Sequence, residues 1–397
     1  MPRVGGGSGD IGAVEIQDGE AVVVNSLNAT SNDAGLTVFG TVNSTGSPVI
    51  VEQDSAGNYV RRNLGTEIGA PSAITDVLTW VDPKDGLFYG AYTSSFQLVV
   101  LTRSADGVWA FDDITSGLTS GRGGGIPVAV IPTTAITQFV SAEATGSRVV
   151  IAGITANGGM VAFEQQQDGR YSFRNISTDL ALGGFATPQL TDLISYRTSW
   201  DSWHLAGIDP SGDIISVWIS PSTFTQWRLD NLSDVTGAPP LAGGLNAILT
   251  SWDGINLTGL DAAGNVRVTW WVPSFGGDWQ SNNLTQENNG VPLTGGSLTG
   301  YYTSWDGMNY AGLDADGNLM AYWWVPSFGG EWRITPIAEA SSSAQLPVTR
   351  LESHVSSTGT LNVMGIASDG SAIRSFWQPG GENIWDVDNL TSLADIS

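Results

Sequence analysis

Oxygen-bearing side chains at alternate positions of a short loop are the clearest candidates for metal chemistry in this sequence. Asp314, Asp316 and Asn318 occupy such positions in the run DADGN. The spacing is typical of the start of a calcium-binding loop, which holds the ion through carboxylate and amide oxygens. The distal glutamate of such a loop is absent, and Asp and Asn are also the usual residues of tight turns. We therefore expect a turn and no required cofactor, with calcium as the alternative.

Aromatic side chains on predicted loops are the candidates for ligand binding, because an exposed ring can stack on the face of a sugar. These candidates are Trp203, Phe275, Tyr301, Tyr302 and Phe328. Phe275 and Phe328 lie in equivalent PSFGG loops, beside glycines. The alternative is that these two rings fill gaps between neighbouring structural units, since large apolar groups are usually packed.

Residues for covalent or acid–base catalysis are sparse. The only histidines are His204 and His354, and a Ser/His/Asp triad is recognised by a geometry that the sequence does not display. We therefore expect both histidines to be packed or at the surface. Glu352 lies two residues before His354, on the same side of a strand. A pair of carboxylates in a central channel would suit a carbohydrate-active hydrolase, which stays open as an alternative.

Composition excludes several classes of function. The 397 residues include no cysteine, so disulfides and thiolate chemistry are absent. The formal net charge is −24, which repels nucleic acid and anionic membranes. The sequence contains no apolar run of the length that a membrane-spanning helix needs.

A repeat positions these candidate residues. The stretch TSWDGINLTGLDAAGNVRVTWWVPSFGGDW at 250–279 recurs almost unchanged at 303–332, and more loosely from Thr198. The leading tryptophans Trp200, Trp252 and Trp305 are 52 and 53 residues apart (252 − 200 and 305 − 252), roughly the period of a propeller blade. Runs of β-branched and aromatic residues between Asp-Gly and Gly-Asn turns predict four short antiparallel strands per repeat.

Packing between repeats accounts for the tryptophans. Trp270 and Trp271 are neighbours on one predicted strand and therefore point to opposite faces of their sheet. Both can be buried only if a sheet packs on each side, as in a ring of blades. Asp201, Asp253 and Asp306 recur with the repeat, so we expect them to form turns and not a catalytic pair.

The predicted fold is an all-β, seven-bladed β-propeller of four-stranded antiparallel blades. Residues 1–12 are predicted to be a flexible segment and 13–397 the propeller. The predicted blades are about 13–64, 73–115, 135–178, 189–234, 244–286, 296–339 and 348–395. A hairpin of 13–17 and 21–25 is predicted to begin the first blade. The TSWDG turns and PSFGG loops are predicted on one face of the ring, and the DAAGN turns and the links between blades on the other.

The motif TSWDG…GLDADGN…YWWVP…W…NLT, with the linking TGAPPL, resembles tryptophan-rich propeller modules of large, uncharacterised extracellular bacterial proteins. Tectonin-type lectin repeats are less similar and share only the G-x-D-x-x-G-x-L-x-x-W cadence. The resemblance implies a propeller in an extracellular or cell-surface setting, within a longer chain. It carries no catalytic residue onto this sequence.

The sequence thus predicts a non-enzymatic binding or structural module that recognises a protein or a glycan through one loop face. The alternatives are the channel hydrolase and a simple spacer within a larger surface protein. The sequence specifies neither the ligand nor the parent protein, and leaves the closure of the ring and the oligomeric state open.

Overall fold

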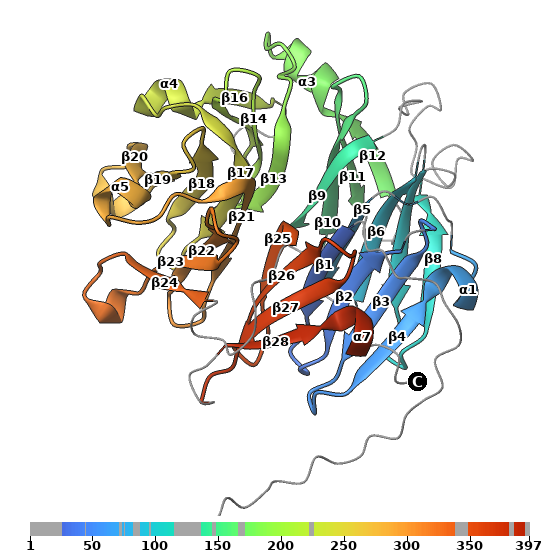
Figure 1. Cartoon of the computed structure of the whole chain (residues 1–397). Coiled ribbons are helices and arrows are strands. Elements are labelled where there is room, and N and C mark those ends of the chain that lie inside the picture. The colour runs from blue at the N-terminus through green and yellow to red at the C-terminus, as the bar shows by residue number, and fades with distance from the viewer. Residues whose placement is uncertain are drawn as a thin grey trace, which may run out of the picture.

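The computed structural model of the chain describes residues 26–43, 45–70, 74, 76–81, 88–94, 97–114, 136–144, 148–165, 171–221, 226–337, 348–380 and 385–393. The predicted N-terminal segment and the predicted hairpin of 13–17 and 21–25 lie outside these residues. The protein is an all-β propeller of four-stranded antiparallel blades, as the repeat predicted (Figure 1).

The described strands form seven four-stranded sheets, which we number in chain order. The first sheet comprises β1 (Ser26–Ser31), β2 (Thr37–Val42), β3 (Pro48–Gln53) and β4 (Tyr59–Asn63), and the second β5 (Asp76–Val81), β6 (Phe88–Ser94), β7 (Gln97–Arg103) and β8 (Trp109–Asp113). The third comprises β9 (Ile136–Ala144), β10 (Arg148–Thr155), β11 (Met160–Gln165) and β12 (Tyr171–Asn175), and the fourth β13 (Thr191–Arg197), β14 (Trp203–Ile208), β15 (Ile214–Ile219) and β16 (Arg228–Asn231). The fifth comprises β17 (Leu241–Leu249), β18 (Ile255–Asp261), β19 (Val266–Trp271) and β20 (Gln280–Asn283), and the sixth β21 (Thr294–Tyr302), β22 (Met308–Leu313), β23 (Leu319–Trp324) and β24 (Arg333–Pro336). The seventh comprises β25 (Val348–Val355), β26 (Leu361–Ala367), β27 (Ala372–Trp377) and β28 (Asp386–Asn389).

The first strand of the first sheet differs from the sequence prediction. It is β1, the polar run SLNATS, where we predicted no strand. The Asn28 side-chain oxygen accepts hydrogen bonds from the backbone N–H and the hydroxyl of Thr79 in the second sheet, at 2.9 and 2.8 Å. Polar side chains on this innermost strand therefore form hydrogen bonds to the neighbouring sheet. A search for alternating apolar residues does not detect a strand of this kind.

Many of the described connections within a sheet are tight turns. In the DAAGN turn, Asp261 accepts hydrogen bonds from the N–H groups two and four residues on, at 2.9 and 3.0 Å, and Gly264 has a φ of 79°. Asp201, Asp253 and Asp306 of the other repeated turn have φ values of 71°, 64° and 64°. Aspartate tolerates this left-handed region better than most residues do, because its short side chain bonds locally. The repeated aspartates form turns, as predicted.

In the described part of the chain, a short helical segment follows the last strand of five sheets. These segments are α1 (Leu64–Glu67), α3 (Ile176–Leu182), α4 (Leu232–Thr236), α5 (Leu284–Glu287) and α7 (Leu390–Leu393). Two single 3-10 turns, η3 (Pro273–Phe275) and η4 (Pro326–Phe328), occupy the PSFGG loops. The asparagines that end the strands cap the helices: the Asn283 side chain, for example, accepts from the Gln286 N–H at 3.0 Å. The sequence analysis predicted no helix after these asparagines.

The interface between two consecutive sheets is called a seam here and is named by its sheets. Each seam holds one cluster of buried apolar side chains. Trp270 packs into the 5/6 seam and Trp271 into the 4/5 seam, so adjacent tryptophans serve opposite faces as predicted. The tryptophan of each TSWDG turn lies against a tryptophan of the next sheet, with ring centroids 5.3 Å apart for Trp200 and Trp271 and 5.7 Å for Trp252 and Trp324.

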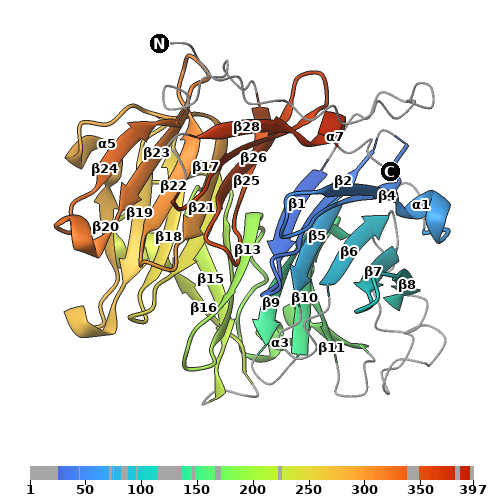
Figure 2. The ribbon, with the colours of Figure 1, turned by 90° about the horizontal axis from the view of Figure 1, so that it is seen from below.

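The ring closes where the seventh sheet packs on the first, and Figures 1 and 2 both show β25–β28 (red) beside β1–β4 (blue). Arg374 donates to Gln53 at 2.8 Å and to the Tyr59 hydroxyl at 2.6 Å, and forms an ion pair with Asp388. In the described part of the chain, every sheet is built from four consecutive strands. Among the residues described, the closing seam is therefore held by side chains, and the first and seventh sheets exchange no strand.

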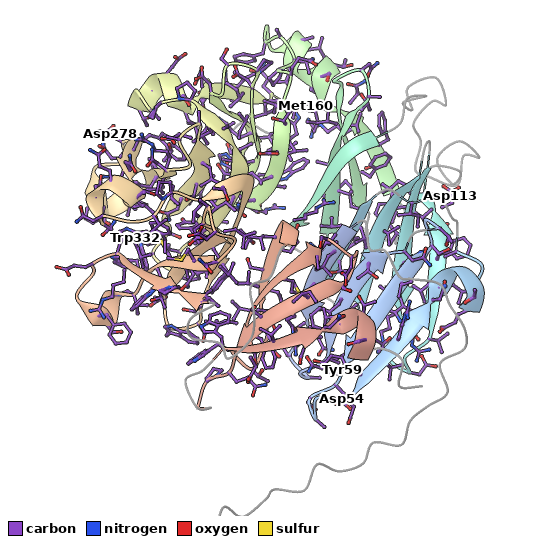
Figure 3. The ribbon with its side chains drawn as sticks, in the orientation of Figure 1. Asp54, Tyr59, Asp113, Met160, Asp278 and Trp332 are labelled. Carbon is purple, nitrogen blue, oxygen red and sulfur yellow. The ribbon has the colours of Figure 1, made fainter. Side chains whose placement is uncertain are left out.

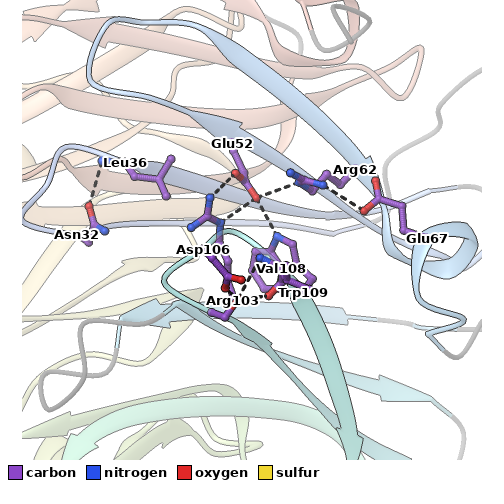
Figure 4. A network of polar contacts seen from close by, with 10 residues as sticks. Asn32, Leu36, Glu52, Arg62, Glu67, Arg103, Asp106, Val108 and Trp109 are labelled. Carbon is purple, nitrogen blue, oxygen red and sulfur yellow. Dashed lines mark hydrogen bonds and ion pairs between the residues drawn. The ribbon is translucent and has the colours of Figure 1, made fainter.

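The 1/2 seam contains a second buried polar network (Figure 4). The Glu52 carboxylate accepts two hydrogen bonds from Arg103, both at 3.0 Å, and one from the Trp109 indole at 2.8 Å. Arg62 lies 3.3 Å from the same carboxylate. The Glu52 side chain is only 7 % exposed, so its charge depends on these partners.

Turns and loops divide between the two faces of the ring as predicted. The TSWDG turns and the PSFGG loops lie at one end of the strands, and the DAAGN-type turns at the other. The link into the sixth sheet passes beside the DAAGN turn of the fifth, where the Leu293 N–H donates to the Gly264 carbonyl at 2.8 Å. None of the helices described is long and apolar enough to cross a membrane.

Candidate functional site

A cavity of about 560 Å³ opens in the 5/6 seam, and we call it the 5/6 cleft. Its lining is mainly aromatic and apolar, with a few amide, hydroxyl and carboxylate groups. The lining residues are Trp252, Asn256, Val268, Trp270, Val272, Ser274, Phe275, Asn282, Leu284, Glu287, Met308, Trp324, Pro326 and Trp332. An apolar pocket of this size with a few convergent polar groups is the usual form of a small-molecule site.

One wall of the 5/6 cleft comes from β19, β20 and α5. The Trp270 indole N–H donates to the Asn282 side-chain oxygen at 2.7 Å, and the Asn282 amide donates to Glu287 at 2.8 Å. This chain of hydrogen bonds orients both the amide and the ring. The wall thus presents a large aromatic surface beside a fixed amide and a carboxylate.

Phe275 forms the rim of this wall. It lies in η3, is 72 % exposed, and packs edge-on against Trp270 with ring centroids 6.0 Å apart. Gly276 and Gly277 follow with φ values of 96° and 74°, and the Gly277 carbonyl accepts from the Trp271 indole at 2.5 Å. The loop is therefore held in place while its aromatic ring stands in solvent.

The opposite wall comes from the sixth sheet. Trp324 lies against Trp252, and Trp252 in turn contacts Tyr302, with ring centroids 6.2 Å apart. Trp332, which Figure 3 labels at this seam, stacks on buried Tyr310 with centroids 5.7 Å apart. These rings are packed on one side, so they form a rigid surface for a ligand on the other.

Hydrogen bonds also join the turns of the two sheets. Asp306 accepts from Tyr302 at 2.6 Å and from Ser251 of the preceding sheet at 2.8 Å. These bonds from Tyr302 and Ser251 lower the pKa of Asp306 below its usual value. The repeated aspartate thus bonds across the seam as well as within its own sheet. Its lowered pKa is the opposite of what a general acid needs.

Equivalent positions in the 6/7 seam are filled differently. Trp323 and Phe328 correspond to Trp270 and Phe275, and their rings pack edge-on with centroids 5.9 Å apart. The Arg333 guanidinium lies 5.3 Å from the Trp323 ring centroid and 5.5 Å from that of Phe328. The residue equivalent to Arg333 in the fifth sheet is Gln280, so the two nearly identical repeats differ in charge at this place.

The predicted ligand-binding residues fall into two groups. Trp203 and Tyr301 are 8 % and 5 % exposed and belong to the apolar clusters of the 3/4 and 6/7 seams. Tyr302 is half-buried and bonded to Asp306. Phe275 and Phe328, at 72 % and 55 % exposed, stand in solvent instead of filling a gap between blades. Of these five, Phe275 lines the 5/6 cleft.

The predicted calcium loop is a hydrogen-bonded turn. One Asp314 oxygen accepts from the N–H groups of Asp316 and Asn318 at 2.9 and 2.8 Å, and the other from the Asn318 side chain at 2.9 Å. In the described part of the chain, no three His, Cys, Asp or Glu side chains gather as metal ligands do. Calcium binding here stays a prediction of the sequence.

The two histidines are packed into seams. His204 lies between the rings of Tyr196 and Trp218, with centroids 4.7 and 5.8 Å away, and burial lowers its pKa to about 4. The His354 Nε2 atom is 2.5 Å from the Ser31 hydroxyl, across the closing seam. Both histidines therefore contribute to packing between sheets, as expected.

Sequence analysis missed most residues of the 5/6 cleft. Asn282 and Glu287 looked like ordinary polar residues near the end of a repeat, and Trp270 and Trp324 like inter-blade packing. The comparison of Gln280 with Arg333 was available in the aligned repeats. The importance of this difference became clear only from the structure, in which the Arg333 guanidinium lies over Trp323 and Phe328.

No protein-family model and no curated protein sequence matches the chain. Among solved structures, the chain is similar to the lectin BP39L from Burkholderia pseudomallei, with a TM-score of 0.64 and 14 % identity over 92 % of this chain and 97 % of that one. AofleA from Arthrobotrys oligospora gives a TM-score of 0.50 and 12 % identity, over 80 % of this chain and 87 % of that one.

The Aleuria aurantia lectin is described as a six-bladed propeller that recognises fucose. It gives a TM-score of 0.48 and 12 % identity, over 92 % of this chain and 95 % of that one. The present chain forms seven sheets instead. These structural neighbours are lectins. Identities this low support a shared fold and nothing narrower, so the ligand of this chain has to be argued from its own cleft.

Proposed function

We propose that this protein is a non-enzymatic, lectin-like protein that binds a glycan in the 5/6 cleft. The observation that carries the proposal is the cavity itself. It combines Trp252, Trp270, Phe275, Trp324 and Trp332 with the polar groups of Asn256, Asn282 and Glu287. The propeller fold that the chain shares with the lectin BP39L supports the same class of ligand.

The chemistry of a sugar suits this lining. A pyranose ring has apolar C–H faces, which pack on aromatic surfaces, and hydroxyls around its edge, which bond to amides and carboxylates. Trp270 supplies the aromatic surface, and Asn282 and Glu287 supply oriented polar groups beside it. The cavity volume lies within the range of about 300–1,000 Å³ that small-molecule pockets occupy.

The lining does not suit glycoside hydrolysis. That reaction requires two carboxyl groups on either side of the scissile bond. Glu287 is the one carboxylate among the lining residues of the 5/6 cleft. For the hydrolase predicted with carboxylates in the central channel, release of sugar that is lost in Glu352→Gln would favour the enzyme.

The setting that we propose is extracellular or at the cell surface, within a longer tryptophan-rich protein. The motif TSWDG…GLDADGN…YWWVP supports this proposal by its resemblance to such modules. Fractionation of the source cells with an antibody to this chain tests it. Recovery of the chain only from the cytoplasm would contradict it.

The experiment for glycan binding is a glycan array followed by titration of the best ligand. Phe275→Ala removes an exposed ring of the 5/6 cleft and should weaken binding roughly tenfold, or about 1.4 kcal/mol, without unfolding the protein. Phe328→Ala is the matched control, because this ring occupies the equivalent loop but does not line the cleft.

A silent array, or equal effects of the two variants on binding, would contradict the proposal for this cleft. Chelation of calcium during the titration should leave binding unchanged, because the polar groups of the cleft act without a metal. Loss of binding with the chelator would favour a calcium site at the turn of Asp314.

A further inference from the structure

We propose that the 5/6 cleft selects glycans that carry a protonated amino group, such as glucosamine oligomers, over neutral and acidic glycans. This inference rests on the proposed function and names the ligand class of the same cleft. Three features of the described residues carry it: the charge of the lining, the aromatic pair on the rim, and the cation that occupies the same place in the next seam.

The charge of the 5/6 cleft is negative. Glu287 is the one charged side chain among the lining residues, and no lysine or arginine is among them. The whole chain carries a formal charge of −24, which raises the local concentration of cations and repels anions. Uronic and sialic acids would bring a second negative charge to Glu287, whereas an ammonium group would pair with it.

The aromatic pair on the rim suits a cation. Cations bind over the faces of tryptophan and phenylalanine because the ring quadrupole is negative there. Trp270 and Phe275 meet edge-on, with an interplanar angle of 80°. Glu287 is linked to this pair through Asn282, so the ring and the carboxylate belong to one fixed unit.

The protein itself shows what this pair binds. In the sixth sheet, the equivalent pair of Trp323 and Phe328 holds the guanidinium of Arg333, at 5.3 and 5.5 Å from the two ring centroids. The fifth sheet keeps both rings but has Gln280 in place of the arginine. The 5/6 cleft therefore repeats an internal cation site without its cation and adds the carboxylate of Glu287.

In a third seam, an arginine of the chain also lies over the aromatic ring at this position. In the seventh sheet, Phe376 occupies the position of Trp270, and the guanidinium of Arg374 lies 4.2 Å from its ring centroid. A cation that belongs to the chain thus covers this aromatic position in the 6/7 and 7/1 seams. In the 5/6 seam, the same place is left to a ligand.

The first test compares oligomers of glucosamine and of N-acetylglucosamine, of equal length, by isothermal titration calorimetry at pH 6. The two sugars differ in the charge of the nitrogen, which acetylation removes. We expect the amino form to bind about tenfold more tightly, and the difference to shrink as salt screens the exposed Glu287. Glu287→Gln keeps the hydrogen-bond acceptor for Asn282 but removes the charge, so it should abolish the preference.

Glu67→Gln is the matched control for that variant. Glu67 is the last residue of α1 in the first sheet, as Glu287 is the last residue of α5 in the fifth. It pairs with Arg62 at 3.4 Å, and neither residue lines the cleft. This variant carries the same change in net charge, so a preference that falls equally in both variants would reflect the field of the whole protein and overturn the proposal.

The second test moves the internal cation. Gln280→Arg should place a guanidinium over Trp270 and Phe275 and weaken binding of the amino form at least tenfold, because the site is filled from within. Gln280 is exposed, so the change spares the core. Arg333→Gln should do the reverse and add a second, weaker site for the amino form at Trp323.

The outcomes separate this inference from the proposed function. Equal affinity for the amino and acetylated oligomers, or tighter binding of the acetylated one, would overturn the charge preference and leave glycan binding standing. A protein that binds neither of these oligomers and no other glycan would overturn both. Binding of the amino form that survives both Glu287→Gln and Gln280→Arg would place the ligand elsewhere and overturn the proposal.

Discussion

The 5/6 seam and the closing 7/1 seam use the same positions of their sheets in opposite ways. Val268, Trp270 and Asn282 face the 5/6 cleft, and pairing registers place Arg374, Phe376 and Asp388 at the corresponding positions of the seventh sheet. The first set leaves a cavity of about 560 Å³. The second set fills its seam with a guanidinium and its partners.

The side chain at one position of the third strand accounts for much of the difference between these two seams. In the 5/6 seam it is Val268, and the space between the sheets is available to a ligand. Where it is Arg374, the side chain crosses the seam to Gln53 and Tyr59 and is only 3 % exposed. Repeats with a shared backbone can thus divide two tasks, closing the ring and binding a ligand, by a few substitutions.

The closing seam should give the largest effect on stability. Arg374→Met removes a buried cation and leaves the half-buried Asp388, Gln53 and Tyr59 without their partner, which should cost roughly 3–5 kcal/mol. Chemical denaturation monitored by tryptophan fluorescence measures this loss. Arg228→Met on exposed β16 is the control and should change stability little; similar losses in the two variants would mean that the network does not hold the ring closed.

His204 in the 4/5 seam should lower the free energy of unfolding by about 3 kcal/mol as the pH falls. Burial lowers the pKa of His204 from 6.5 to about 4, so the unfolded chain binds a proton that the folded chain excludes. Stability is therefore complete above pH 6.5 and falls as the pH drops toward 4, by about 1.4 kcal/mol for each pH unit. Asparagine stands at this position in the next three sheets, so His204→Asn should remove this part of the pH dependence in denaturation series; an unchanged slope would show that other groups cause it.

The 5/6 cleft should respond in binding more than in stability. Trp270→Ala removes the main ring of the wall and should weaken glycan binding about 30-fold, or ~2 kcal/mol, as for a central aromatic contact. Trp323→Ala is the matched control, because its ring is covered by Arg333. If titration shows equal losses of affinity for the two variants, the comparison between an open and a filled seam is wrong.

The smallest effect concerns the helix that carries part of the cleft. Asn283→Ala removes the cap of α5 and should cost about 1 kcal/mol of stability, as should Asn63→Ala at α1. Only the first variant should also weaken binding, because α5 holds Leu284 and Glu287 in the cleft wall. Thermal unfolding and titration of both variants test this, and weaker binding in Asn63→Ala would show a general effect.

Much of the fold could be predicted from the repeat. The spacing of Trp200, Trp252 and Trp305 indicated blades, and adjacent Trp270 and Trp271 indicated a ring with sheets on both sides. Both inferences follow from period and alternation, which are local properties of a sequence. The strand Ser26–Ser31 escaped this reasoning, because its polar residues bond to Thr79 in another sheet.

The candidate site could be predicted only in part. Phe275 was named as a candidate because it lies beside glycines on a predicted loop face, although packing between blades stayed open as the alternative. Trp203 and Tyr301 were expected on a loop face, but their backbone lies in strands whose inward direction depends on register with the neighbouring sheet. Glu287 required knowledge of α5, which packs the end of one repeat over the seam to the next.

Closure of the ring by two sheets whose described strands are all their own has a consequence for how the chain folds. Contacts between neighbouring sheets join residues about 50 positions apart, as Asn28 and Thr79 are at 51, whereas Arg374 and Gln53 are 321 positions apart. Because the entropy of loop closure grows with the logarithm of length, the final seam costs roughly 1.6 kcal/mol more to close than the others. The sheets can therefore assemble in order along the chain, as in linear repeat proteins, and the two ends should meet last. The buried Arg374 network lies at the one seam where that additional entropy has to be offset.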